Sequence, residues 1–292
     1  MNFSIRYLTE YLYAAPVTDN LNALRVQPAN TANQRCDDFH LLIDPETRLG
    51  RHVDYFGTEV IEFGVSRPHT RLSVDARARV VTSTPAPPPA APWEALDTAA
   101  YRDVAGEFLL PVGAQASDPR LDALGRRMAA ATPAEAVQRL AELIPDEFAY
   151  QAGVTYVGST VADLLEAGAG VCQDFVHLAL ILLRRRGIAA RYVSGYLFAA
   201  PADGGSNSVE VDTHAWVEAL LPTEGAPAWV GFDPTNRSRA GERHVKIGHG
   251  RHYPDVPPIK GVFRGGGSAQ LETSVRMTRL DAVGTAAAIL AP

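Results

Sequence analysis

The spacing of hydrophobic residues changes along the chain from a strand period to a helix period and back again. In TRLSVDARARVV, residues 70–81, apolar side chains at the even positions from Leu72 to Val80 alternate with polar ones. This period of two predicts a strand with one buried face. FSIRY, FHLLI and VIEFGV show shorter versions of the pattern, separated by turn sequences. We therefore predict an antiparallel, sandwich-like β domain over residues 1–83.

A proline-rich stretch ends this first pattern. TPAPPPAAP, residues 84–92, has five prolines, which remove backbone donors and favour an extended linker. Beyond it, residues 93–292 are predicted to form a second domain that opens with helices. Asp118 with Pro119, and Thr132 with Pro133, are the cap and first-turn residues expected where two of these helices begin.

From residue 190 the strand pattern returns in RYVSGYLF, THAWVEALL and AWVGFD. A strand-like C-terminal extension, LETSVRMTRL, follows.

Composition and charge exclude several classes of function. The net charge of −6 and the 21% of charged residues do not suggest a nucleic-acid or membrane partner. The N-terminal residues lack the pattern of a signal peptide, so we expect a cytoplasmic protein. Two cysteines form no disulfide framework or zinc motif, so neither a Cys36–Cys172 bridge nor a bound metal or cofactor is expected. The oligomeric state stays open.

Cys172 stands where a helix is expected to begin. In GAGVCQDFVHLALILLRRRG, residues 168–187, glycines precede the cysteine, apolar residues then recur at helical spacing, and three arginines precede Gly187. The free amides at a helix N-terminus favour a thiolate and can stabilise an oxyanion. The alternative is a small buried thiol with no chemical role.

A nucleophilic thiolate needs a base from another element. His177 lies five residues after Cys172 and so about 140° around the helix, which favours a structural role. His214 lies on a predicted strand, and a four-residue hairpin loop would pair Leu221 near Ala226 and place His214 opposite Asp233. A register slip of two would still leave both on one face as diagonal neighbours. Cys172, His214 and Asp233 are therefore predicted to form a catalytic triad.

Other polar and aromatic residues have simpler explanations. We interpret the histidines of ERHVKIGHGRHYPD as a solvated loop rather than a metal site, because their spacing fits no zinc pattern. Asp174 suits the first turn of a helix, and tryptophans are expected in the core. The residues assigned to the loop are His244, His249 and His252, and those assigned to the core are Trp216 and Trp229. Tyr150 and Gln151 are weak candidates for holding an oxyanion.

With these residues in place, the chain resembles the bacterial transglutaminase-like (papain-like thiol) superfamily. GVCQDFVHLALILLRRRGIAARYVSGYL, DTHAWVEALLP and WVGFDPTN resemble its catalytic core, and YLYAAPV, LRVQPANTANQ, FHLLIDP, DYFG and SRPH resemble a β-rich N-terminal region that accompanies this core. The resemblance implies an α+β fold with a papain/transglutaminase-like core, in which the cysteine helix packs on an antiparallel sheet that carries His214 and Asp233. It also implies attack of Cys172 on a carboxamide or peptide carbonyl and a thioester acyl-enzyme.

Two positions depart from the family pattern. Thr58 stands where asparagine often follows FG, and His252 stands where GRDY-like stretches have an acid. Three functions remain open at this point: cleavage of amide or peptide bonds, acyl transfer to an amine, and peptide binding without catalysis. The expected partner is a peptide or protein substrate.

Overall fold

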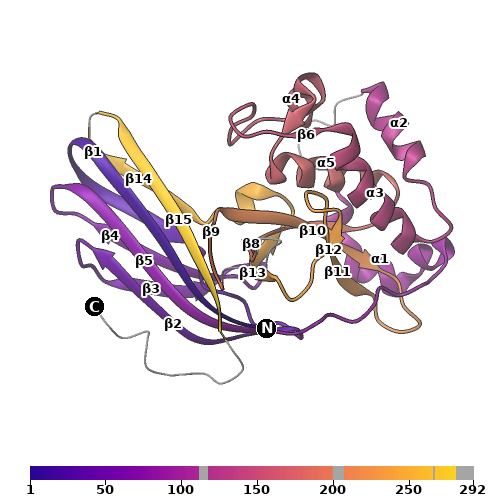
Figure 1. Ribbon diagram of the computed structural model, residues 1–292, viewed down its shortest axis with the longest axis horizontal. Coiled ribbons are helices and arrows are strands. Elements are labelled where there is room, and N and C mark those ends of the chain that lie inside the picture. Colours follow the sequence, from indigo (N-terminus) through magenta and orange to yellow (C-terminus); the bar gives the residue numbers. More distant parts are fainter. Residues whose placement is uncertain (112–117, 200–206, 266, 281–292) are drawn as a thin grey trace.

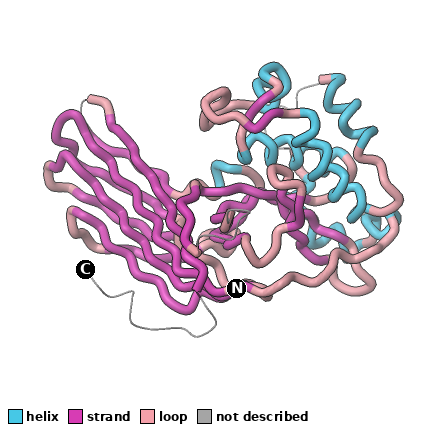
Figure 2. The backbone as a smooth tube through the Cα atoms, in the orientation of Figure 1, coloured by secondary structure: helices cyan, strands magenta, loops and turns pink. Residues whose placement is uncertain are grey.

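The computed structural model describes residues 1–111, 118–199, 207–265 and 267–280. Two antiparallel sheets and a group of helices make up this part of the chain (Figure 1), which agrees with the predicted α+β class. Figure 2 shows the strands of the first sheet on one side and the helices on the other, with the second sheet between them. Among the described helices, none is both long and apolar enough to cross a membrane.

The first sheet is built around a single long strand, β1 (Asn2–Leu24). Its first half pairs with β5 and β15, and its second half pairs with β4 and β14, so the sheet curls along β1. The predicted alternation is confirmed in β5, where every second residue from Leu72 to Val80 is buried. The other strands of this sheet are β2 (Gln34–Asp44), β3 (Leu49–Val53), β4 (Glu59–Val65), β5 (His69–Thr82), β9 (Ser208–Val211), β14 (Ile259–Arg264) and β15 (Ala269–Leu280).

The strand expected at LETSVRMTRL lies within β15, and β14 is an additional strand before it; both strands pair with β1. Two segments at opposite ends of the sequence therefore lie side by side in one sheet (Figure 1). The proline-rich residues 84–92 contain no helix or strand. The division into domains at residues 83 and 93 stays a prediction.

The second sheet has the strand order β12-β11-β10-β8-β13. Its strands are β8 (Ala190–Leu197), β10 (Thr213–Leu221), β11 (Ala228–Asp233), β12 (Ser238–Arg239) and β13 (His244–Gly250). The helices are α1 (Ala99–Ala105), α2 (Pro119–Arg127), α3 (Pro133–Glu147), α4 (Val161–Ala167) and α5 (Cys172–Arg185), with 3-10 turns at Trp93–Asp97, Gly106–Leu109 and Tyr253–Asp255. A short parallel pair, β6 (Ala149–Tyr150) and β7 (Ala169–Gly170), precedes α5.

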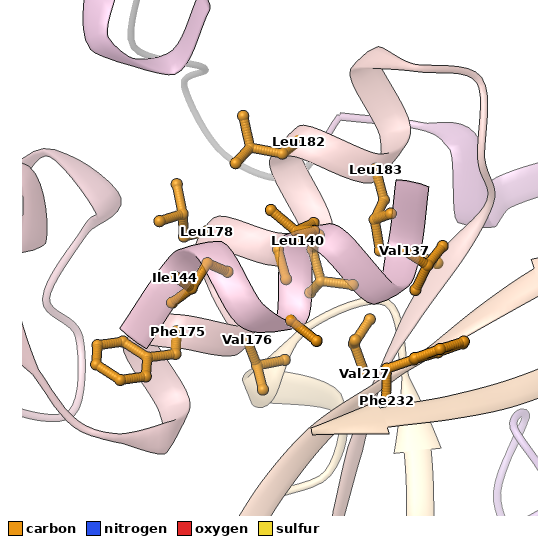
Figure 3. Packing of buried hydrophobic residues seen from close by; sticks show 14 of the residues in the cluster. Val137, Leu140, Ile144, Phe175, Val176, Leu178, Leu182, Leu183, Val217 and Phe232 are labelled. Carbon is orange, nitrogen blue, oxygen red and sulfur yellow. The ribbon is translucent and has the colours of Figure 1, made fainter. Parts of the chain in front are cut away.

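Helix α5 packs on β10 and β8, and α3 packs beside it, against α5 and against β10, β11 and β12. Figure 3 shows Leu140 and Ile144 of α3 above Phe175 and Val176 of α5, with Val217 of β10 below. The starts of α2 and α3 are those predicted, since the side chains of Asp118 and Thr132 cap them, and the Thr160 side chain caps α4 in the same way. Burial of this apolar cluster fixes the N-terminal end of α5 against the sheet.

The opposite side of the second sheet packs against the first sheet. Tyr196 of β8 and Val245 of β13 share a core with strands β1 and β5. The two sheets are also joined by Gln34, whose amide nitrogen donates to the Lys246 carbonyl and whose amide oxygen accepts from the Lys246 amide, each at 2.7 Å.

Candidate active site

Cys172 is the first residue of α5, where the sequence predicts the helix to begin. The preceding Val171 has an extended backbone, and its amide donates to the Asp174 carboxylate at 2.8 Å. Asp174 also accepts a hydrogen bond from the Thr155 hydroxyl at 2.6 Å, which ties the loop after β6 to the helix start. The amides of Cys172 and Gln173 belong to the first turn, where an α-helix offers no intrahelical acceptor. They are available to stabilise negative charge beside the Cys172 sulfur.

His214 and Asp233 lie on the adjacent strands β10 and β11, at a register that differs from the predicted one. Leu221 pairs with Ala228 instead of Ala226, because the connecting loop has six residues, 222–227, instead of four. The slip of two makes His214 and Asp233 diagonal neighbours on one face, as the period of a strand requires. His214 Nε2 lies 2.8 Å from Asp233 Oδ2.

The imidazole of His214 contacts both of the other predicted triad residues. Its side chain also hydrogen-bonds that of Cys172. Because Nε2 of His214 is hydrogen-bonded to Asp233, Nδ1 is the ring nitrogen that interacts with the Cys172 sulfur. Burial alone would lower the pKa of His214, but the hydrogen bonds and charges of Asp233 and Cys172 raise it to about 9. At neutral pH the ring is therefore an imidazolium, a positive charge beside the Cys172 sulfur.

Asp233 is fully buried and saturated with hydrogen-bond donors. Oδ2 accepts from His214, from His244 Nε2 at 3.0 Å and from Asn236 Nδ2 at 2.8 Å. Oδ1 accepts from the backbone amides of Thr235 and Asn236 at 2.9 and 3.2 Å. Burial raises the pKa of Asp233, but the hydrogen bonds from both histidines outweigh it and hold the pKa well below its usual range. The carboxylate therefore stays ionised and orients the His214 ring.

The interpretation of residues 244–252 as a solvated loop is wrong for most of the segment. His244–Gly250 is the strand β13, with Val245 and Ile247 buried in the core shared with the first sheet. The three histidines have three different partners: His244 contacts Asp233, His249 Nε2 lies 3.0 Å from Arg191, and His252 contacts Asp255. The segment forms a strand because its apolar face is buried against the distant first sheet. The spacing of the histidines carries no information about that contact.

Among the described residues, His214, Asp233 and His244 bring one ligand atom each within 4.8 Å of one another, a grouping that can hold a metal ion. The protonation of His244 does not fit this use. Its Nδ1 accepts a hydrogen bond from the Gly241 amide at 3.1 Å, so the proton of the neutral ring is on Nε2, which faces Asp233. A metal ligand there must be an unprotonated nitrogen.

The remaining sequence candidates lie around the triad. Tyr150 is 60% exposed and packs edge-on against Phe175, and the Gln151 amide donates to the Gly170 carbonyl at 2.9 Å. Trp216 is buried as expected and stacks on His214, with ring centroids 6.3 Å apart. Trp229 packs under the Arg191 guanidinium at 4.1 Å. A role for Tyr150 or Gln151 in holding an oxyanion stays a prediction.

A mostly apolar cavity of about 780 Å³ runs along the flank of α5. Gln173, which follows Cys172 in sequence, forms part of its wall, as do His177 and Ile181 further along the helix and His252 across from it. His177 packs against Tyr192, and burial lowers its pKa to about 4, so this ring is neutral. Thr58, the other departure from the family pattern, is buried against Gly248 of β13.

Comparisons with known proteins agree with this arrangement. Residues 3–81 match the model of the bacterial transglutaminase-like N-terminal region, and residues 122–234 match that of the transglutaminase-like superfamily. The second match contains Cys172, His214 and Asp233. An uncharacterized protein of Mycobacterium leprae is 37% identical over 274 residues, which cover 93% of this chain and 96% of that protein.

Two further relatives are more distant. The crystal structure of a candidate cysteine protease from Cytophaga hutchinsonii matches 98% of this chain and 92% of its own, with a TM-score of 0.74 at 24% identity, which shows a shared fold. A protein-glutamine gamma-glutamyltransferase of Pseudomonas aeruginosa is 30% identical over 160 residues, 51% of this chain and 24% of that protein. The chain belongs to the transglutaminase-like superfamily and carries the bacterial transglutaminase-like N-terminal region.

Proposed function

We propose that this protein is a cysteine-dependent enzyme that cleaves amide or peptide bonds through a thioester acyl-enzyme. The observation that carries the proposal is the hydrogen bonding of one imidazole, His214, to both Cys172 and Asp233 at the N-terminus of a helix. An activated nucleophile has this signature: a base within reach of the thiol, and a third group that orients the base.

In this mechanism the Cys172 thiolate attacks the carbonyl carbon, and the carbonyl π electrons move to oxygen to form an oxyanion. The first-turn amides of α5 stabilise that charge. The oxyanion collapses, the C–N bond breaks, and the Nδ1 proton of His214 goes to the leaving amine. Neutral His214 then takes a proton from water, which attacks the thioester and releases the acid. Asp233 holds the ring in place during both steps.

The substrate we propose is a peptide or protein amide. Cys172 is half-buried at the start of α5, to which Thr155 and Asp174 tie the loop after β6, and in that loop Tyr156 and Val157 are 75% and 69% exposed. Val157 also forms part of the wall of the cavity beside α5. Exposed apolar side chains around a reactive thiol suit a substrate with apolar groups near the bond that is cleaved.

Acyl transfer to an amine is the second candidate. It is favoured by the named activity of the Pseudomonas aeruginosa relative, a protein-glutamine gamma-glutamyltransferase. Both reactions share the acyl-enzyme and differ only in whether water or an amine resolves it. Peptide binding without turnover is the third candidate, and the intact hydrogen bonds of His214 and Asp233 argue against it.

The test is a screen of the wild-type protein against peptide and amide libraries, with and without a primary amine. Release of the acid supports hydrolysis, and amine conjugates support transfer. Cys172→Ala must abolish either product, whereas Cys36→Ala, the matched change at the other free cysteine, must not. Binding of peptides that survives Cys172→Ala, with no turnover by the wild type, would leave the binding module as the better explanation.

A further inference from the structure

Asp233 binds two imidazoles, and the second one has no assigned role. His244 Nε2 lies 3.0 Å from the same Oδ2 atom that accepts from His214 Nε2. The His244 side chain is only 7% exposed. It is the first residue of β13, which pairs with β8 at the far edge of the second sheet from β11. Residues 240–243, between β12 and β13, bring it back to the carboxylate.

The protein backbone sets the tautomer of His244. The Gly241 amide donates to Nδ1 at 3.1 Å, and the His244 amide donates back to the Gly241 carbonyl at 2.9 Å. An Nδ1 that accepts a hydrogen bond carries no proton, so the neutral ring has its proton on Nε2 and donates it to Asp233. A proton on Nδ1 would face the Gly241 N–H, and two donors cannot hydrogen-bond each other. The backbone contact thus directs the Nε2 proton of His244 at Asp233.

Close packing leaves little room for the His244 ring to turn. Trp216 lies edge-on to it, with ring centroids 5.2 Å apart, and the same indole stacks on His214. The indole reaches this place because Gly195 on β8 has no side chain: a Cβ there would lie 2.6 Å from the Trp216 ring and 2.2 Å from the Val245 carbonyl. One indole thus packs against both imidazoles that share Asp233.

We propose that His244 is a positioning residue, which acts through Asp233 to hold its Oδ2 lone pair on His214. The inference rests on the proposed function. With His214, His244 and Asn236 all donating to Oδ2, and two amides donating to Oδ1, the carboxylate has no free direction in which to turn. It is also a poor proton acceptor, so the Nε2 proton stays on His214. The proton that leaves the imidazolium is then the one on Nδ1, next to the sulfur and the leaving amine.

The kinetic test compares two variants of His244. His244→Phe keeps a ring and removes the donor, and we expect kcat to fall about tenfold or more with KM within about twofold of wild type. His244→Gln returns an amide donor near the position of Nε2 and restores most of kcat. His249→Gln is the control, because this histidine lies on the same strand but contacts Arg191. Unchanged kcat in His244→Phe, or equal loss in the Phe and Gln variants, would overturn the proposal.

Two readouts do not depend on a substrate and so separate this inference from the proposed function. In ¹⁵N-histidine-labelled protein, we expect the neutral ring of His244 to be the tautomer with a protonated Nε2 and a bare Nδ1. The pH profile of Cys172 alkylation by iodoacetamide should change in His244→Phe and return to the wild-type profile in His244→Gln. An Nδ1–H tautomer, or an alkylation profile unmoved in His244→Phe, overturns the inference even if the wild type cleaves amides. If His244→Phe does not fold, His244→Asn, whose amide is too short to reach, replaces it in each comparison.

Discussion

Replacing Asp233 by asparagine tests the electrostatics of the site most sharply. The carboxylate accepts five hydrogen bonds, three at Oδ2 and two at Oδ1. An asparagine side chain has one oxygen and one NH₂ group. In either orientation the NH₂ group faces at least two buried donors, so no rotamer of asparagine satisfies the site.

The size of the effect follows from His214. Its pKa is raised from 6.5 to about 9, a difference of 9 − 6.5 = 2.5, which corresponds to about 3 kcal/mol. Burial opposes this shift, and the hydrogen bond that His214 donates to Asp233 is the first of the effects that produce it. Without the carboxylate, burial dominates, and we expect the pKa of His214 to fall to 6.5 or below.

The sign of the stability change depends on pH. A group whose pKa is raised in the folded state stabilises it fully below its unfolded pKa, here about 6.5, and stops doing so as pH rises through about 9. The free energy of unfolding of Asp233→Asn should therefore lie below that of wild type by about 3 kcal/mol at pH 6, and by less at pH 10. Urea unfolding at both pH values measures this, and ¹⁵N NMR gives the pKa of His214 directly.

The control is Asp212→Asn, which removes the same charge from an exposed residue two positions before His214. We expect this variant to behave like wild type in both measurements. A pKa of His214 that stays near 9 in Asp233→Asn, or an unfolding free energy unchanged at pH 6, would refute the reasoning.

Two further predictions concern the packing and charges behind the triad. Gly195→Ala should lower the free energy of unfolding by about 2 kcal/mol or more, because its Cβ would collide with the Val245 carbonyl and the Trp216 ring. The control, Gly125→Ala on α2, has nothing within 4 Å of the new Cβ and should raise the free energy of unfolding by about 0.5–1 kcal/mol. Chemical denaturation measures both variants, and equal effects would contradict the close approach at Gly195. Glu218→Gln should cost about 3–5 kcal/mol at pH 7, because Lys246 Nζ and Arg191 Nε each lie 2.6 Å from the carboxylate. Burial raises the pKa of Glu218, but these two cations outweigh it and hold the pKa at about 2. The difference in unfolding free energy between wild type and Glu218→Gln should therefore shrink as pH falls from 4.5 towards 2. A difference that is constant over this range would count against the ion pairs.

Local sequence signals predict the helices and their starts because caps act over three or four residues. Thr132, Thr160 and Asp118 each cap the helix that follows them, and Cys172 begins α5 where the apolar spacing indicates. The contact of His214 with Asp233 also follows from local pattern, since a two-residue slip preserves the face of a strand.

Interactions between distant segments are not visible in the same way. The pairing of β15 with β1 depends on contacts across more than 250 residues, and the alternation within either strand does not select its partner. His244 reaches Asp233 only because residues 240–243 cross from one edge of the second sheet to the other. The hairpin register depends on a six-residue loop whose Pro and Gly predict a turn without fixing its length.

The central claim is that Cys172, with the His214 imidazolium beside it at a helix N-terminus, is a more reactive nucleophile than an ordinary thiol. The most direct measurement is the rate of alkylation of each cysteine by iodoacetamide between pH 5 and 10, resolved by peptide mass. Cys36 is the internal control, because burial raises the pKa of its thiol. The account predicts that at pH 6.5 Cys172 reacts at least about tenfold faster than Cys36 and than a simple thiol. Equal rates for Cys172 and the simple thiol across this range would contradict it.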